Sequence, residues 1–252
     1  MKKNLALPII FTLGLLLSVS CGKQPDHSLK VMSYNIHTGI GVDGKRDLER
    51  IARIINEQDP DFVGLQEVDH MVTRTGWTDQ MDELARYTGM HPIFAPTIEF
   101  QGGLYGIGAL VKNKPIRSYT IPLLDKDEPR VLLVMEYENY LLLNTHLPLN
   151  ERSRATAIND IGRMANVYGK PTILTGDFNA TPDSKEITDM AANWTILSDT
   201  KKFTCPAENP SITLDYIMGY KMDGVKYKVT NFKVLNEPDA SDHLPVYLEV
   251  KF

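Results

Sequence analysis

Cysteine is scarce in this chain of 252 residues, which contains only Cys21 and Cys205. Because Cys21 is a candidate for covalent modification, as argued below, no partner is left with which Cys205 could form an intrachain disulfide. A metal site built from cysteines is excluded for the same reason. Any metal ion would therefore be held by oxygen and histidine nitrogen atoms.

The chain also lacks an excess of basic residues. Its formal net charge is −5, with 27 Lys and Arg residues against 32 Asp and Glu residues. Loss of residues 1–20, argued below, would remove Lys2 and Lys3 and no acid, which takes the net charge to −7. Proteins that bind the phosphate backbone of nucleic acids usually carry a basic surplus. The composition therefore disfavours tight non-specific binding of nucleic acid, although a small basic patch within an acidic total would escape this argument.

The N-terminus lacks a hydrophobic run long enough for a spanning helix. Its apolar stretch, from Leu5 to Leu17, is shorter than the ~20 residues that such a helix needs. The stretch follows two lysines and precedes small residues and a cysteine, which is the pattern of a secretory signal peptide. A retained membrane anchor is the alternative.

The cysteine at its end makes this signal similar to that of a bacterial lipoprotein. We expect residues 1–20 to be removed and Cys21 to carry the lipid as the first mature residue. Ser18 stands where such signals usually have Leu, and plain secretion without a lipid is the alternative. The lipoprotein interpretation places the protein in the bacterial cell envelope, in the periplasm or at the outer membrane, and attaches it to a membrane through its lipid.

Linkers, low-complexity tracts and internal repeats are absent after the signal. Residues 21–28 are polar and contain a Pro, so they are predicted to form a short tether. Residues 29–252 are numerous enough to bury one large core. We therefore expect one catalytic domain over residues 29–252, present as a monomer.

Hydrophobic periodicity predicts helices and strands that alternate early in the chain and strands that follow one another elsewhere. The predicted helices cover residues 47–59, 79–89, 151–169 and 182–192. The predicted strands cover residues 29–36, 60–68, 105–111, 130–137, 139–147, 171–179, 214–220, 228–235 and 243–252. This order predicts an α/β protein with two mixed sheets and helices on the outside.

Polar side chains recur at the ends of these apolar strands. The set comprises Asn35, Glu67, His146, Asp177, Asn179, Asp215, Asp242 and His243. A single Asp or His at a strand end is usually a turn or capping residue. Open α/β sheets, however, build their binding sites at strand ends, so a set drawn from the whole chain indicates a shared site.

The residue types in this set suit metal-assisted hydrolysis of a phosphoester. Carboxylate and amide oxygens favour a hard cation, Mg²⁺ or Mn²⁺. A His next to an Asp can act as an imidazole base or as an electrostatic clamp. Phosphoryl transfer needs a metal to neutralise oxygens, donors for the phosphate and a group that positions water.

Five motifs, SYNI, DFVGLQEVD, TGDFNATPDS, LDYI and SDHLPV, occur in this order along the chain. Together they resemble the endonuclease/exonuclease/phosphatase family, the deoxyribonuclease-I-like superfamily, over residues 29–252. That superfamily includes deoxyribonucleases, abasic-site repair nucleases, sphingomyelinases and inositol-polyphosphate phosphatases. The resemblance implies an α/β fold in the form of a four-layer α/β/β/α sandwich, with two mixed β-sheets packed face to face.

The resemblance also implies roles for the polar set. Asn35 and Glu67 match the family's metal ligands, and Asp242 matches a further carboxylate near the metal. His243 matches a residue described either as general base or as phosphate-contacting His, with its imidazole fixed by Asp215. The other matches are Asp177 for positioning the attacking water or holding a second ion, Asn179 for donating to the phosphoryl oxygen, and His146 for the His of the deoxyribonuclease and sphingomyelinase branches.

Two further residues are candidates for substrate contact, Arg130 and Tyr105, although a structural role is the alternative for Arg130. The segment GGLYGIGALV departs from GGEYGNAILS, the form that many small bacterial members resembling this chain carry. Leu104 and Ile107 replace a carboxylate and an amide there. The departure leaves the metal set intact and concerns the wall of the pocket, and hence the choice of substrate.

These observations predict a divalent-metal-dependent phosphoesterase that hydrolyses a phosphodiester of a lipid, an inositol or another small molecule at the cell envelope. One alternative is a secreted or envelope endonuclease similar to deoxyribonuclease I; acidity, envelope anchoring and His146 disfavour nucleic acid as the substrate. The other is a lipoprotein that binds without catalysis, which the complete polar set disfavours.

Overall fold

The computed structural model describes residues 27–123 and 128–252. The expected signal peptide, the lipidated Cys21 and most of the tether lie outside these residues. The first strand begins at Ser28, and the backbone of His27 pairs with that of Phe252. The folded domain therefore includes the last two residues that were expected to belong to the tether.

Thirteen strands and four α-helices, with two short 3₁₀ turns, are found in the described residues. The strands are β1 (Ser28–Asn35), β2 (Phe62–Val72), β3 (Thr78–Asp79), β4 (His91–Phe100), β5 (Gly103–Val111), β6 (Arg117–Leu123), β7 (Arg130–Glu136), β8 (Leu141–His146), β9 (Thr172–Asp177), β10 (Trp194–Ile196), β11 (Asp215–Tyr220), β12 (Lys228–Val234) and β13 (Val246–Lys251). The helices are α1 (Leu48–Gln58), α2 (Gln80–Thr88), α3 (Glu151–Tyr168) and α4 (Lys185–Met190), and the 3₁₀ turns are η1 (His37–Gly39) and η2 (Thr73–Thr75).

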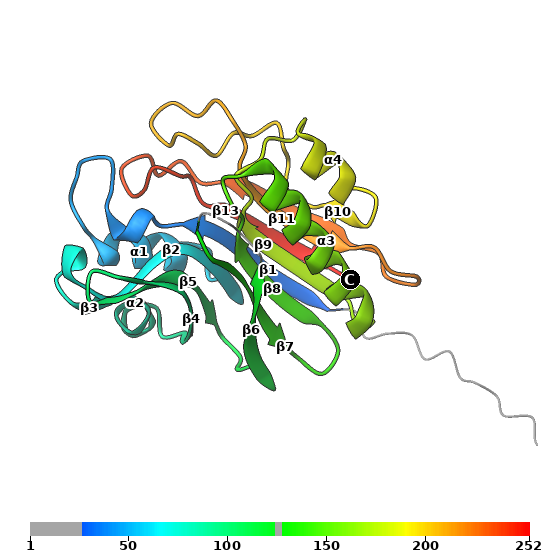
Figure 1. Cartoon of the computed structure of the whole chain (residues 1–252), viewed down its shortest axis with the longest axis horizontal. Coiled ribbons are helices and arrows are strands. Elements are labelled where there is room, and N and C mark those ends of the chain that lie inside the picture. The colour runs from blue at the N-terminus through cyan, green and yellow to red at the C-terminus, as the bar shows by residue number, and fades with distance from the viewer. Residues whose placement is uncertain (1–26, 124–127) are drawn as a thin grey trace, which may run out of the picture.

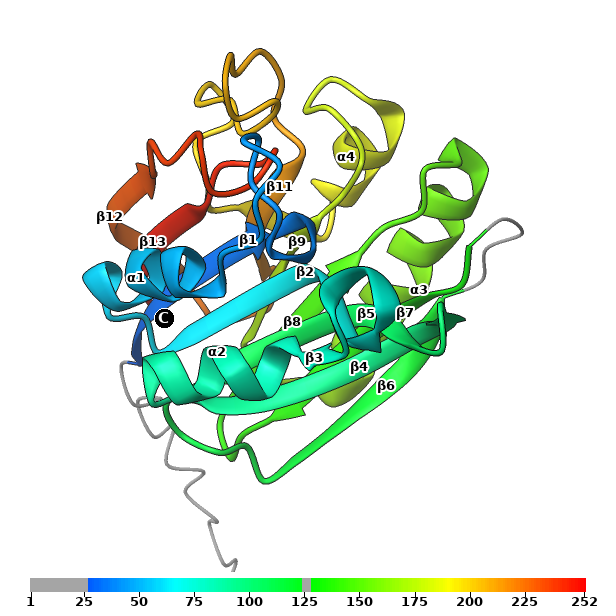
Figure 2. The ribbon, with the colours of Figure 1, turned by 90° about the vertical axis from the view of Figure 1, so that its left-hand side faces the viewer.

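The strands form two sheets. A seven-stranded sheet has the order β12-β13-β1-β2-β5-β4, with β3 paired to β2, and a six-stranded sheet has the order β10-β11-β9-β8-β7-β6. Each sheet is mixed, because β1 and β2 are parallel in the first and β8 and β9 are parallel in the second. Helices α1 and α2 cover the first sheet and α3 covers the second (Figure 2). The predicted four-layer α/β/β/α sandwich is confirmed.

Three apolar clusters lie between the four layers. One joins α1 and α2 to the seven-stranded sheet and includes Ile51 and Leu84. A second joins α3 and α4 to the six-stranded sheet and includes Ile161 and Trp194. The third, which includes Phe62, lies between the two sheets. This layering explains why the central strands are almost continuously buried, since each is covered on both faces.

Capping residues mark the ends of the predicted helices. The side chains of Asp47 and Asn150 accept hydrogen bonds from backbone N–H groups in the first turns of α1 and α3. Gly89 and Gly169 end α2 and α3 in the left-handed conformation, which glycine adopts without strain. None of the helices in the described residues has the length and hydrophobicity of a membrane span.

Four strands were not predicted: β4, β6 and β10, which lie at sheet edges, and the two-residue β3, which pairs with β2 outside the main strand order. Strand β4 contains Pro92 and Pro96, and β6 contains Pro122. Proline cannot donate to the hydrogen-bond ladder, so its presence in a sequence argues against a strand. An edge strand nevertheless tolerates it. Strand β10 has only three residues, which is too few for a periodic signal.

Candidate functional site

The topology brings four strand ends to one edge of the sandwich. Strands β1, β8 and β9 end there, at Asn35, His146 and Asp177, and β11 begins there at Asp215. His146 and Asp215 are the register partners of Asp177 on its two sides. Glu67 lies on β2 next to Gln66, the partner of Asn35. The structure therefore brings these residues together, but Glu67 lies inside β2, which continues to Val72, and not at a strand end as expected.

Asn35 connects the two sheets at this edge. Its side-chain amide donates 3.0 Å hydrogen bonds to Glu67 on its own sheet and to Asp177 on the other. Its side-chain oxygen accepts from the backbone N–H of His37, and its backbone oxygen accepts from the hydroxyl of Ser241. Asn35 is fully buried, so these bonds fix the metal-ligand candidates relative to the phosphate-contacting candidates.

Glu67 occupies a bulge in β2. The register of β2 against β5 shifts between Leu65 and Val68, and Glu67 has a φ of +56°. A bulge of this kind turns one side chain away from the regular alternation of the strand. Burial raises the pKa of Glu67 above its ordinary value, and the neighbouring carboxylates of Asp242 and Asp177 raise it further, although the hydrogen bond from Asn35 acts in the opposite direction.

Asp215 and His243 form a buried pair. Nδ1 of His243 lies 2.9 Å from Oδ2 of Asp215, and the two side chains are 8% and 1% exposed. Burial alone would disfavour the imidazolium, but the negative charges of Asp215 and Asp177 outweigh it and raise the pKa of His243 well above its ordinary value. These charges favour the imidazolium form of His243, and its Nε2 lies 3.7 Å from Asp177.

His146 has the opposite protonation state. Its Nε2 lies 3.5 Å from Asp177 and its Nδ1 lies 3.3 Å from the guanidinium of Arg130. Burial lowers the pKa of His146 to about 3, with the charge of Arg130 acting in the same direction and that of Asp177 against it. The site therefore contains one neutral and one charged imidazole on the two sides of Asp177.

Asp177 and Asn179, from the stretch LTGDFNAT, lie together at the end of β9. The backbone N–H of Asn179 donates to Asp177 at 2.9 Å, and the side-chain amide of Asn179 donates to the carbonyl of Leu147. Asn179 has a φ of +48°, in the left-handed region that Asn tolerates better than most residues. Its amide is thus held at the edge of the site, partly exposed.

The two substrate-contact candidates lie beside the site. Arg130 is 5% exposed, and its guanidinium contacts Glu128 at 2.9 Å as well as His146. Its Nε has no hydrogen-bond partner among the described residues. Burial, followed by the charge of Glu67, raises the pKa of Tyr105, so its hydroxyl keeps its proton and can donate.

The two departures from the family pattern differ in their surroundings. Ile107 is 2% exposed and belongs to the cluster between the sheets. An amide at that position would be buried among apolar side chains. Leu104 is partly exposed and lines a surface cavity together with His70 and Phe100. Of the two, only Leu104 is placed to influence a bound molecule.

The described residues fit a divalent cation. The carboxylates of Asp177 and Asp242 lie near Glu67, and each of them disfavours the ionised form of Glu67. A hard cation bound among the three would relieve this repulsion. By spacing alone, Asp177, Asp215 and His243 could also hold an ion, since one ligand atom of each lies within 4.8 Å of the others. An ion at the second place would have to replace the bond between His243 and Asp215, so we favour the first.

A layer of polar side chains lies directly beneath the site, between the sheets. Asn144, two residues before His146, donates to the backbone oxygens of Leu65 and Gly108 on the other sheet. Its oxygen accepts from Gln66 at 2.7 Å and from Thr175 at 3.1 Å. All these side chains are fully buried, so the network ties the strand that carries Glu67 to the strands that carry His146 and Asp177.

Three residues near the site were not identified from the sequence. His37 lies 3.9 Å from Asp242 on a 3₁₀ turn with a φ of +45°. Ser241 holds the backbone of Asn35, as described above. Arg74 pairs with the buried Asp69 through two 2.8 Å bonds and stacks on Phe100. His37 directly follows the motif SYNI, Ser241 begins SDHLPV, and Asp69 ends DFVGLQEVD. Nothing in the sequence marked Arg74.

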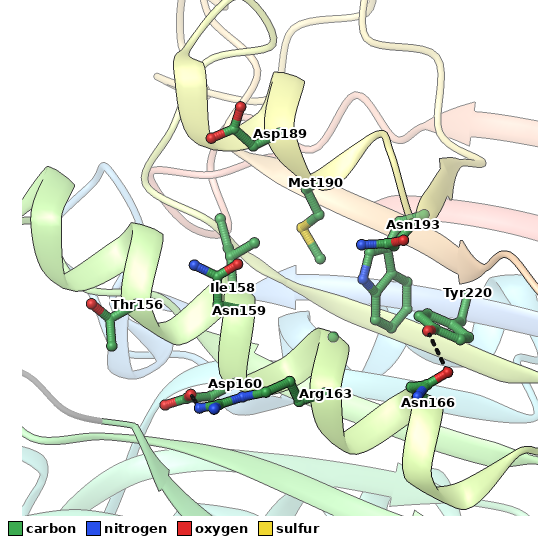
Figure 3. A pocket seen from close by; sticks show the side chains of 12 residues that line it. Thr156, Ile158, Asn159, Asp160, Arg163, Asn166, Asp189, Met190, Asn193 and Tyr220 are labelled. Carbon is green, nitrogen blue, oxygen red and sulfur yellow. Dashed lines mark hydrogen bonds and ion pairs between the residues drawn. The ribbon is translucent and has the colours of Figure 1, made fainter.

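A larger cavity, of about 720 Å³, lies elsewhere, between α3, α4 and Tyr220 (Figure 3). Its polar groups are largely paired with one another or with close neighbours: Asp160 with Arg163, and Tyr220 with Asn166. None of the predicted site residues lines it. The cavity is therefore separate from the polar site.

A profile of the endonuclease/exonuclease/phosphatase family matches residues 32–243. The chain belongs to this family. Members of the family are hydrolases of phosphoesters, which agrees with the polar set at the strand ends.

Solved structures show the same fold. A mannosyl-6-phosphatase from Bacteroides thetaiotaomicron has a TM-score of 0.73 and 18% sequence identity, over 89% of this chain and all of its own. A family protein from Beutenbergia cavernae has a TM-score of 0.73 and 20% identity, over 89% of this chain and 72% of its own. The human Nocturnin catalytic domain has a TM-score of 0.68 and 23% identity, over 88% of this chain and 94% of its own. No curated protein matches the chain.

Proposed function

We propose that this protein is a divalent-metal-dependent phosphoesterase that hydrolyses a phosphodiester of a lipid, an inositol or another small molecule at the bacterial cell envelope. One observation supports it above the others: Asp177 lies between the amide of Asn35 and the imidazoles of His146 and His243. A carboxylate in this position has a cation site on one side and phosphate donors on the other.

The metal ion would be held by Glu67 and Asp242, with Asn35 offering its oxygen in place of its present bond to the His37 N–H. When bound, the ion neutralises charge on the phosphoryl oxygens. The residues of the chain then divide the remaining work. Asp177 orients the attacking water and accepts its proton, because its carboxylate is the group that faces both sides of the site.

His243 contacts the phosphoryl group as an imidazolium. The sequence left it open whether His243 is a base or a phosphate-contacting residue, and its raised pKa favours the second role. Asp215 keeps the imidazolium in place, as carboxylates do for functional histidines elsewhere. Neutral His146 and the amide of Asn179 add uncharged donors, and Arg130 and Tyr105 contact the rest of the substrate.

A panel of phosphoesters tests this proposal. The purified protein is offered glycerophosphodiesters, sphingomyelin, phosphoinositides and supercoiled plasmid DNA, with Mg²⁺, with Mn²⁺ and with a chelator. We expect turnover of a small or lipid phosphodiester that the chelator abolishes. Fast, salt-dependent nicking of the plasmid at catalytic enzyme concentration would instead establish the nuclease alternative. No turnover of any phosphoester would leave the non-catalytic alternative.

A further inference from the structure

The chain enters the domain at the end of the sandwich opposite to the site. Strand β1 runs from Ser28 directly to Asn35, and at ~3.3 Å per residue its ends lie about 23 Å apart. In Figure 1 the C-terminus and the hairpin between β11 and β12 lie at the right, whereas the loop that follows β1 lies at the left. We call the end that carries Ser28, Tyr140 and Phe252 the entry end.

The chain before β1 is too short to reach the site. Six residues, 21–26, separate the expected lipid at Cys21 from His27. At full extension they span at most about 22 Å, whatever conformation they adopt. This is less than the length of β1 alone, and a path to the site would also have to pass around the layers of the sandwich.

The entry end carries unpaired positive charge. Exposed Lys114, Lys226, Lys228 and Lys251 form no ion pair among the described residues, and Lys228 and Lys251 are register partners on neighbouring strands. The exposed acids of this end that are likewise unpaired among those residues are Glu138 and Asp223. The entry end is therefore basic although the protein as a whole is acidic.

Aromatic and aliphatic side chains lie at the same end, where Tyr137, Tyr140 and Phe252 are half-buried against the cluster between the sheets. Tyr137 and Tyr140 stack with their ring centroids 4.7 Å apart, and Tyr140 also contacts His27 and Phe252. Ile116, in the same loop as Lys114, is 71% exposed. Tyrosine with lysine is the combination found where proteins meet the headgroup region of a bilayer.

We propose that the entry end rests on an anionic phospholipid bilayer and that the catalytic site faces away from it. This orientation rests on the envelope anchoring in the proposed function, and it narrows the class of substrate that the phosphoesterase can reach. The headgroups of the anchoring bilayer lie out of reach, so the substrate is a soluble phosphoester or one presented by an opposing surface. The short chain before β1 keeps the entry end close to the anchoring bilayer, and the lysines turn this end towards an anionic surface.

Energy transfer from the protein to the bilayer tests the orientation. The lipidated protein, with Cys205→Ser, is inserted into phosphatidylglycerol liposomes that contain an acceptor dye on their headgroups. A donor dye is attached at Lys114→Cys on the entry end or at Lys45→Cys, an exposed position in the loop after β1. Transfer should be clearly stronger from position 114. Equal or stronger transfer from position 45 would overturn the proposal.

Charge reversal tests the role of the lysines. Each lysine near an anionic surface contributes about 1 kcal/mol to binding. The double variant Lys226→Glu with Lys228→Glu should therefore lower the ratio of docked to undocked protein by roughly 10- to 30-fold or more. The loss of transfer from position 114 should occur in phosphatidylglycerol and not in phosphatidylcholine liposomes. The matched control is Lys201→Glu with Lys202→Glu, two exposed lysines in the loop between β10 and β11, and should cause no loss. An equal loss in the control, or none in the test pair, would show that the lysines do not dock the protein.

A substrate comparison tests the consequence for catalysis. The same phosphodiester headgroup is offered in the anchoring liposomes and as a water-soluble short-chain compound. Turnover should be confined to the soluble form, and efficient cleavage within the anchoring bilayer would contradict the proposed orientation. Because energy transfer does not require activity, a protein that docks but cleaves neither compound would refute the proposed function and leave the docking surface standing.

Discussion

Nδ1 of His243 donates a 2.9 Å hydrogen bond to Asp215, a residue 28 positions away on a different element. Asp215 lies opposite Asp177 in the pairing of β11 with β9. The carboxylate that fixes the imidazolium and the carboxylate that faces it are thus neighbours in one sheet. The pairing of β11 with β9 therefore positions both the partner that stabilises the charge of His243 and the carboxylate of Asp177.

We expect His243→Ala and Asp177→Asn each to reduce turnover at least 10²-fold, because each removes a group that acts directly on the attack at phosphorus. Both residues serve one step, so the double variant should lose far less than the product of the two single losses. Turnover and melting temperature are measured on the same preparations. If the variants instead melt early but retain near-normal turnover per folded molecule, GDFN is only a structural turn.

Glu67→Gln should separate stability from metal binding. Glu67 is a partly buried carboxylate whose pKa is raised by burial and by the nearby carboxylates. Without metal, removal of its charge should leave the melting temperature unchanged or raise it. Calorimetric titration with Mn²⁺ should show much weaker binding, and turnover should collapse. Full activity of the wild-type protein in excess chelator would end the metal hypothesis.

Cys21→Ser should move the protein from the membrane fraction to the soluble envelope fraction. The expected lipid is attached through the sulfur of this residue, and serine cannot replace it. Fractionation followed by mass spectrometry of the N-terminus checks the result. Unchanged membrane association with residues 1–20 still attached would identify a retained anchor.

His146 gives a prediction for the pH dependence of stability. Burial lowers its pKa to about 3 in the folded protein, against ~6.5 in the unfolded chain. Between these values the unfolded chain binds the additional proton, so stability is fully present above pH 6.5 and is lost as the pH falls towards 3. In this pH range the wild-type protein should lose up to about 1.4 kcal/mol of its free energy of unfolding per pH unit through His146. His146→Gln should remove this contribution.

Urea unfolding of both proteins at pH 7 and at pH 5, in chelator, measures this difference. The variant should lose less stability on acidification than the wild-type protein. Parallel losses in the two proteins would show that His146 is not held neutral by its surroundings.

The sequence was sufficient to predict the layers of the fold and to predict that the polar side chains share one site. Strand β9 is a continuous apolar run, and helix α3 has helical periodicity and a cap at each end. Motifs at strand ends converge wherever such strands lie side by side. Other features depend on contacts that no local pattern encodes. The protonation states of His146 and His243 follow from burial and charged neighbours across the sheets, and Arg74 is held by Asp69 and Phe100 only in the folded chain.

The network beneath the site gives the last prediction. Asn144 joins the sheets through Gln66, Leu65 and Gly108, and Gln66 directly precedes Glu67. We expect Asn144→Leu to weaken Mn²⁺ binding roughly 10- to 100-fold, the usual effect of removing a partner that orients metal ligands. Stability should fall by about 1–3 kcal/mol, because Gln66 is left buried without its partner.

The double variant Asn144→Leu with Gln66→Leu distinguishes positioning from packing. Replacing both members of the Asn144–Gln66 bond by apolar groups removes the part of the loss that is due to Gln66. The melting temperature of the double variant should therefore recover in part, since the carbonyl oxygens of Leu65 and Gly108 still lack their donor, while Mn²⁺ affinity stays low. Thr145→Val is the matched control, since its hydroxyl bonds to Val131 within one sheet and makes no connection to the other. Recovery of Mn²⁺ affinity together with stability in the double variant would mean that Asn144 only fills the core.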